Sequence, residues 1–304
     1  MPDRNTMRYN LRRLLRFSLL SEDADPAPPQ ATESEVLFDL TGENPGNRLF
    51  GRYDVDQVRE IARKAGLYEG LERLGYADPI LSLSCADPSE QRICLYAGEM
   101  VRERLLVELR MQLTNFHPRH AIGPFTEATS FRMLVLLWLV LSNPEKDFPV
   151  DRPRLPGQLR PGLGLLDEMF LFLRTFSRDL AVDGTLDVPE HYHTALFYSR
   201  YFRYLDPVAE GRLEAIARDL AGVPLALASE AIKGGCLVDR STGAPLPWQP
   251  SEQVMTERGP LGRFLRSQEY ENARDRARTA LHVVVNWDLY REKLASGELG
   301  QKSP

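Results

Sequence analysis

The feature of this sequence that most constrains the fold is an apolar run from Phe131 to Leu141, in which Arg132 is the only charged residue. Such a run suits either a β-strand that is buried on both faces or a helix in a hydrophobic core, and periodicity alone does not separate the two. The run is too short for a transmembrane helix, which needs about 20 apolar residues. Much of the fold assignment therefore depends on whether this segment is a strand.

The segments before this run have the period of strands. Residues 79–85 and 92–97 are strand-like, and Asp87-Pro88-Ser89 lies between them as a turn, so they predict a hairpin. Residues 104–113 alternate moderately, which fits a third strand, and their propensities fit a helix nearly as well. The remaining predictions are a short strand at 185–188 and helices at 54–65, 68–74, 191–202, 206–220 and about 270–294.

A glycine-rich segment from Gly157 to Gly164 leads into an amphipathic helix, whose apolar positions recur at helical spacing from Leu165 to Leu180. Gly162-Leu163-Gly164 stands at the entrance to this helix. A Gly-x-Gly there leaves backbone N–H groups bare beside the positive end of the helix dipole, which suits an anionic phosphate. The alternative is a tight turn that needs small residues and binds nothing.

The order of elements from residue 54 to 202 is helix, hairpin, third strand, apolar fourth strand, glycine loop, helix, strand and helix. This order resembles the GNAT superfamily of N-acyltransferases. The resemblance implies an α/β (α+β) fold with a mixed, mostly antiparallel sheet and flanking helices, and a helical extension at the C-terminus. The expected divisions are a basic arm with an acidic, proline-containing linker over 1–50, a GNAT-like domain over 51–205, and a mainly helical extension over 206–304.

The resemblance also implies a ligand, acyl-coenzyme A, as co-substrate. The backbone of Gly162, Leu163 and Gly164 would hold its pyrophosphate, helped by Arg160. The glycine loop departs from the family pattern at one position, because Leu159 stands where the family has glutamine or arginine. The connection from the fourth strand to this loop is also longer than the family norm.

Two catalytic roles, a proton donor and a base, also have candidate residues. A tyrosine after the fifth strand often protonates the departing thiolate in this family, and Tyr198 is the nearest positional match, ahead of Tyr192. Tyr198 also belongs to an aromatic cluster of the kind that forms a core. The amine that attacks the thioester must lose a proton, and Glu190 and Glu108 are candidates for that base by position.

Two other functions compete with acyl transfer. The pairs His117/His120 and His191/His193, the second preceded by Glu190, could hold zinc or iron(II), although no known metal motif is present and no metal is favoured. A GNAT-like module without catalysis could instead bind a protein partner or a second copy of itself through the C-terminal region. Trp248 is a candidate anchor for such a contact.

Charge and cysteine usage restrict partners and location. The net charge of −5 gives no global attraction to nucleic acid, so no such partner is expected. The three cysteines form no C-x-x-C pair, which is typical of reduced thiols in the cytoplasm. Residues 7–20 are basic and amphipathic but lack a signal-peptide core, so they predict a docking helix or a frayed arm. A soluble cytoplasmic protein without membrane insertion is expected.

Overall fold

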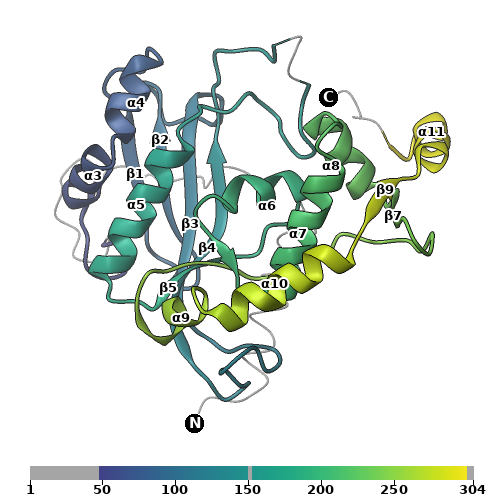
Figure 1. The fold of residues 1–304 in the computed structure, drawn as a ribbon. Helices are drawn as coiled ribbons and strands as arrows, with labels where there is room; N and C mark the ends of the chain where they lie inside the picture. The colour runs from purple at the N-terminus through teal and green to yellow at the C-terminus, as the bar shows by residue number, and fades with distance from the viewer. Residues whose placement is uncertain (1–47, 150–152, 300–304) are drawn as a thin grey trace. The chain divides into compact units, whose positions relative to one another are not determined.

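The computed structural model describes residues 48–149 and 153–299, and these form a mixed α/β structure (Figure 1). A seven-stranded sheet has the order β1-β2-β3-β4-β5-β8-β6, and a second sheet consists of β7 and β9. The pairs β1/β2, β2/β3, β5/β8 and β6/β8 are antiparallel, whereas β4 and β5 are parallel. The predicted α/β class is confirmed. The predicted arm at 7–20 and linker at 21–35 lie outside the described residues.

The strands of the described chain are β1 Ile80–Ser84, β2 Gln91–Tyr96, β3 Leu105–Phe116, β4 Phe131–Leu141, β5 Gly184–Asp187, β6 Arg203–Tyr204, β7 Leu237–Asp239, β8 Gln253–Met255 and β9 Val283–Val285. The helices are α3 Val55–Lys64, α4 Leu67–Arg73, η1 Arg102–Arg104 (a 3₁₀ turn), α5 Leu166–Asp179, α6 Tyr192–Tyr198, α7 Pro207–Asp219, α8 Leu225–Lys233, α9 Gly259–Phe264, α10 Gln268–Ala280 and α11 Trp287–Ala295.

The chain divides into two compact units, and each is built from several separate segments. The described part of unit 1 comprises 48–113, Leu136–Asp147 and Leu159–Thr175. The described part of unit 2 comprises Thr114–Val135, 148–149, 153–158 and 176–299. The expected domain boundaries near residues 50 and 205 stay predictions.

In unit 1 the first helix begins where the sequence predicts. The side chain of Asp54 accepts a hydrogen bond of 2.9 Å from the N–H of Gln57, and the Gln57 side chain accepts one of 3.1 Å from the N–H of Asp54. This reciprocal capping box satisfies two N–H groups that a helix terminus otherwise leaves unpaired. The predicted hairpin is confirmed as β1 and β2, with Ile80 opposite Tyr96 and Ser84 opposite Arg92.

The two ambiguous segments are both strands. The segment predicted as strand or helix at 104–113 is β3, and the apolar run from Phe131 to Leu141 is β4. β4 pairs in parallel with β5 through Met133–Val135. A chain that connects two adjacent parallel strands must cross over between them, and α5 is that crossover.

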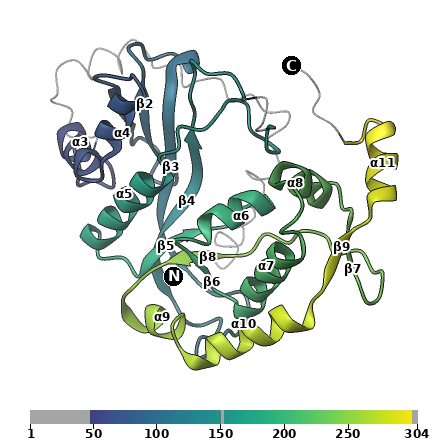
Figure 2. The ribbon, with the colours of Figure 1, turned by 45° about the horizontal axis from the view of Figure 1, so that its top comes forward.

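In unit 2 a helix pair and a small sheet occupy the C-terminal region. Helices α7 and α10 lie side by side, as both ribbon views show (Figures 1 and 2). Their close approach depends on Gly211, because a Cβ atom there would lie 2.4 Å from the carbonyl oxygen of Arg274. The separate sheet pairs Leu237 with Val285 and Asp239 with Val283.

The prediction of one continuous helix at about 270–294 is wrong. The structure has α10, then β9, then α11 in this interval. β9 consists of Val283, Val284 and Val285, and β-branched side chains favour the extended conformation that pairs here with β7. The helix predicted at 191–202 is also shorter, because α6 ends at Tyr198 and the chain becomes extended again at Arg203.

Candidate functional site

The glycine segment forms an open turn before α5. Gly164 has a φ of +73°, a left-handed conformation that side chains rarely adopt, and a Cβ atom there would meet no atom within 4 Å. Gly162 and Gly164 are exposed, whereas the intervening Leu163 is buried. Within the described part of the chain, the N–H groups of Gly162, Leu163 and Gly164 donate no hydrogen bond to another backbone group. Their donors are therefore available to a ligand or to solvent.

Hydrogen bonds hold the two ends of the preceding loop together in unit 1. The N–H of Asn143, just beyond β4, donates to the carbonyl of Pro161 at 2.8 Å. Asn143 Oδ1 also accepts a 2.6 Å hydrogen bond from the hydroxyl of Tyr76, which is buried. Arg160 Nη1 donates to the carbonyl of Pro144 at 2.5 Å. The glycines therefore follow a point that is fixed to the end of β4.

The charges around this turn are mixed. Arg160 is the predicted helper for a phosphate, and one of its N–H groups donates to the Pro144 carbonyl. Asp167 and Glu168 lie in the first turn of α5, where negative charges already interact with the positive end of the helix. The negative charge of Glu168 is partly compensated by Arg73, whose Nη2 lies 3.4 Å from Glu168 Oε1. Binding of an anion at this turn would therefore depend mainly on the backbone N–H groups.

The predicted catalytic residues Tyr198 and Glu190 lie in unit 2, whereas Arg160 and the Gly162–Gly164 turn lie in unit 1. Tyr198 is 8% exposed and stacks on Phe202 with 5.8 Å between ring centroids. Burial, together with the nearby Asp187 carboxyl, raises the pKa of Tyr198 well above its usual value, so its phenol stays neutral. The roles assigned to Tyr198 and Glu190 stay predictions.

Glu108, the other candidate base, lies within an ion-pair network on β2 and β3. Its carboxylate is 2.8 Å from Arg110 Nη2 and 3.5 Å from Arg92 Nε. Arg110 also lies over the ring of Trp138, with its guanidinium carbon 5.8 Å from the ring centroid. The carboxylate of Glu108 is therefore engaged by two guanidinium groups.

Sequence reasoning missed a buried acid in unit 2. Asp187 ends β5, a strand whose four residues are all buried, and it lies opposite Gln253 of β8. Burial raises the pKa of Asp187 to about 7, although the N–H of Val188 offsets part of that effect. The signal in the sequence was an aspartate at the end of a buried strand, a place where polar side chains often serve a site.

The histidines do not assemble a metal centre within the described chain. Across residues 48–149 and 153–299, no group of three His, Cys, Asp or Glu side chains is placed to hold a metal ion. His191 and His193 stack with 5.2 Å between ring centroids. Burial, with a smaller effect from His191, lowers the pKa of His193 to about 3, so its imidazole is neutral.

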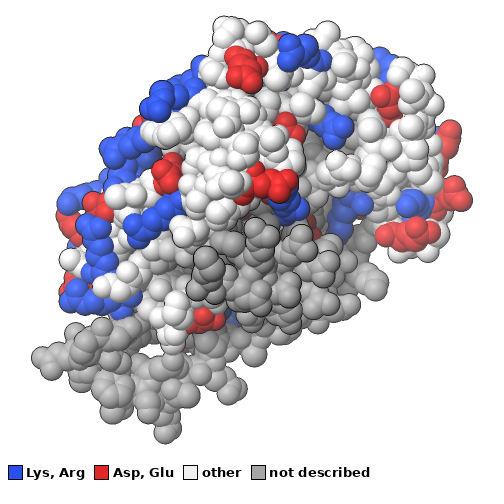
Figure 3. All heavy atoms as spheres, turned by 90° about the horizontal axis from the view of Figure 1, so that it is seen from below, with Lys and Arg blue, Asp and Glu red and all other residues white. Residues whose placement is uncertain are grey.

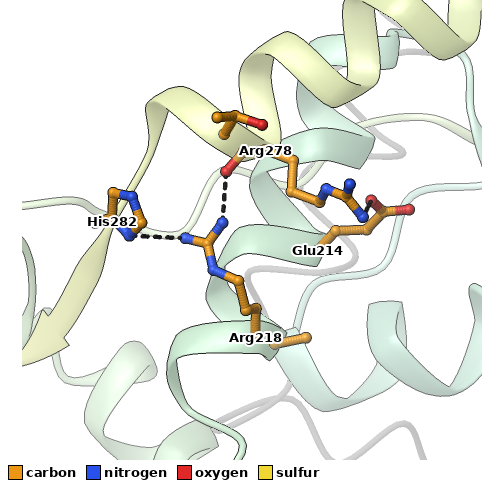
Figure 4. A pocket seen from close by; sticks show the side chains of 6 residues that line it. Glu214, Arg218, Arg278 and His282 are labelled. Carbon is orange, nitrogen blue, oxygen red and sulfur yellow. Dashed lines mark hydrogen bonds and ion pairs between the residues drawn. The ribbon is translucent and has the colours of Figure 1, made fainter.

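An open pocket lies beside α7 and the end of α10, all within unit 2 (Figure 4). Arg218 points into it and donates to the carbonyls of Arg278, at 2.8 Å, and Leu281, at 2.6 Å. It also contacts His282 Nδ1 at 3.1 Å and pairs with Asp219 at 2.8 Å. Arg218 therefore caps the C-terminal end of α10. These hydrogen bonds give its guanidinium group a structural role in the pocket that requires no ligand.

The remaining features restrict the function only weakly. Acidic and basic side chains share the face shown in Figure 3, with Lys and Arg more numerous along one margin. Cys85, Cys94 and Cys236 are buried, and none of them forms a disulfide within the described residues. None of the helices in the described ranges has both the length and the apolar character that crossing a bilayer requires. Trp248 is half-buried against Tyr192, with 5.9 Å between ring centroids.

Comparison with known proteins adds no assignment to these observations. No protein-family model, no curated protein and no solved structure matches this chain.

Proposed function

We propose that this protein binds an acyl-coenzyme A, or a related pantetheine thioester, at the turn that precedes α5. The observation that carries the proposal is the exposed, left-handed Gly164 at the entrance to α5, beside N–H groups that donate to no backbone carbonyl of residues 48–149 and 153–299. N–H groups at a helix N-terminus bind phosphate because they are unpaired and because the helix dipole favours negative charge.

The position of this turn after a strand of the sheet also favours a bound thioester. It follows β4, whose parallel partner is β5, and ligands of such crossover units bind beyond the carboxyl ends of the parallel strands. The ladder between β4 and β5 covers only Met133–Val135. The following residues Leu137–Leu141 are apolar yet partly exposed, and Trp138 is 40% exposed.

A pantetheine arm suits this part of β4. It is a slender chain with two amide groups, and an extended chain of amides can bind along a strand by backbone hydrogen bonds. Its apolar segments would cover side chains that the chain itself leaves half-exposed. Acyl transfer to an amine is the reaction we propose for the bound thioester. Tyr198 is the proposed proton donor to the thiolate, and Glu190 is the proposed base.

Thermal unfolding with acetyl-coenzyme A, a longer acyl-coenzyme A and free coenzyme A tests the proposal. A ligand that binds only the folded state raises the melting temperature with dose, and 100 Kd of ligand adds about 2.7 kcal/mol of stability. Gly164→Glu places a carboxylate where the phosphate would bind, and it should abolish the shift.

Gly98→Glu is the matched control for that variant. Gly98 also lies in unit 1, is exposed, has a φ of +82° and has no atom within 4 Å of a Cβ position. It therefore carries the same backbone strain and the same new charge at another place, and its ligand shift should equal that of the wild type. Absence of a shift with every thioester would reject the proposal and favour a binding module without catalysis.

A further inference from the structure

The buried end of β5 holds a carboxyl group with an unpaired oxygen. Asp187 is only 9% exposed, and its Oδ2 atom is buried without a hydrogen-bond partner among the described residues. The carboxyl group interacts with the N–H of Val188, which accounts for one of its two oxygens. An ionised carboxylate carries negative charge on both oxygens, and leaving one of them buried without a donor is energetically costly.

A second unpaired acceptor lies on the neighbouring strand. Gln253 is fully buried and is the register partner of Asp187 in the antiparallel ladder between β5 and β8. Its Nε2 group donates to the carbonyl of Ala195 at 3.2 Å, which leaves its Oε1 as the atom without a partner. Directly opposite residues of antiparallel strands project from the same face, with Cβ atoms about 5 Å apart.

The titratable groups of the described chain that influence Asp187, or are influenced by it, include no cation. Tyr198 from α6 and Tyr204 from β6 are the titratable side chains near enough to feel its charge, and burial raises the pKa of both phenols. The β4 residues that pair with β5 are Met133, Leu134 and Val135, and none of them titrates. Neither a lysine nor an arginine contributes to the pKa of Asp187 in the described chain.

We propose that Asp187 is held as the neutral acid, and that its Oδ2–H donates a hydrogen bond to Oε1 of Gln253. One proton then supplies the donor that both unpaired oxygens lack. Loss of that proton would leave both buried oxygens without a donor, so the pair is a proton-binding site within unit 2. The pKa of Asp187, which burial raises to about 7, agrees with this arrangement.

Carboxyl-carbon NMR on the full chain, labelled with ¹³C at the aspartate side chains, tests this proposal. One resonance should keep the chemical shift of a protonated acid until the pH approaches 7, whereas an unperturbed aspartate titrates at about 3.9. Asp187→Asn should remove that resonance. Asp183→Asn changes an acid just before the same strand and should leave it in place.

The wild-type spectrum alone decides the matter if Asp187→Asn does not fold. A spectrum in which every aspartate titrates near pH 4 would overturn the proposal, because Asp187 would then be ionised beside a bound water or cation. The readout does not depend on coenzyme A, so its failure is distinguishable from failure of the proposed function.

Discussion

The hydroxyl of Tyr76 donates a 2.6 Å hydrogen bond to the side-chain oxygen of Asn143, and both residues are buried. Asn143 in turn donates its backbone N–H to Pro161, immediately before the glycine turn. We therefore expect Tyr76→Phe to lower the free energy of unfolding by about 1–2 kcal/mol, since the loss of one buried hydroxyl removes a hydrogen bond but little volume. Urea denaturation measures the change.

Tyr192→Phe is the control for that substitution. Tyr192 is also buried, but burial alone shifts the pKa of its hydroxyl, with no contribution from a hydrogen bond. Its removal should change stability by less than about 0.5 kcal/mol. Equal effects of the two substitutions would contradict a stabilising role for the Tyr76–Asn143 bond.

The contact between α7 and α10 predicts a large effect from a single methyl group. A Cβ atom at Gly211 would lie 2.4 Å from the Arg274 carbonyl oxygen and 2.8 Å from the Ala277 Cβ. Gly211→Ala should therefore destabilise the protein by about 1–3 kcal/mol, because the helices must move apart. Gly222→Ala, where a Cβ atom meets nothing within 4 Å, should have little effect in the same thermal unfolding experiment.

A buried ion-pair network provides the next prediction. Glu210 accepts hydrogen bonds from Arg203 Nη2 at 2.6 Å, from the N–H of Tyr204 at 3.0 Å and from the hydroxyl of Tyr270 at 2.6 Å. Glu210→Ala removes the acceptor that these three donors share, although Arg203 keeps its pair with Glu271 and the Tyr270 hydroxyl keeps the Tyr204 carbonyl, and it should cost roughly 3 kcal/mol. Asp288→Ala breaks the pair with Arg291, which is exposed, and should cost less than about 1 kcal/mol.

Asp187 and His193 should make stability depend on pH in opposite directions. Asp187 titrates near 7 when folded instead of 3.8, so the stability that it contributes is complete below pH 4 and is lost as pH rises to 7. His193 titrates near 3 when folded instead of 6.5. The unfolded chain therefore binds a proton that the folded chain does not, and stability falls as pH drops from 6.5 to 3.

Substitution of either residue should reveal the pH dependence of stability that the other residue causes. Asp187→Asn should make the free energy of unfolding rise with pH between 4 and 6.5, by on the order of 2–4 kcal/mol. His193→Gln should make it fall over the same interval. Urea denaturation in a series of buffers measures both slopes, and two variants with the slope of the wild type would contradict these assignments.

The local patterns in the sequence predicted most of unit 1. The Asp54 cap, the hairpin turn at Asp87-Pro88-Ser89 and the helix after Gly164 act through neighbouring residues, and the structure has each of them. The Phe131–Leu141 run could not be assigned from its period, because a strand that is largely buried shows no alternation. In the structure this run is a strand that pairs with β5, and the residues of β5 lie far from it in the sequence.

The C-terminal region shows the limit of the same reasoning. Val283–Val285 pairs with Leu237–Asp239, a partner that no pattern near the valines reveals. The glycine turn of the candidate site was visible as a motif, since Gly164 needs a left-handed conformation that glycine adopts without strain. The buried acid at Asp187 was not visible as a motif, because its properties depend on burial and on the Gln253 side chain of another strand.

The segmented makeup of the two units determines how this protein can be divided. The chain passes from one unit to the other after residues 113, 135, 147, 158 and 175. A single cut after residue 135, 147 or 158 therefore divides both units, whereas a cut after 113 divides only unit 1 and a cut after 175 divides only unit 2. β4 itself contributes Leu136–Leu141 to unit 1 and Phe131–Val135 to unit 2. Ribosomal synthesis must accordingly reach residue 175 before unit 1 has all its parts. A nascent chain shorter than this cannot complete either core.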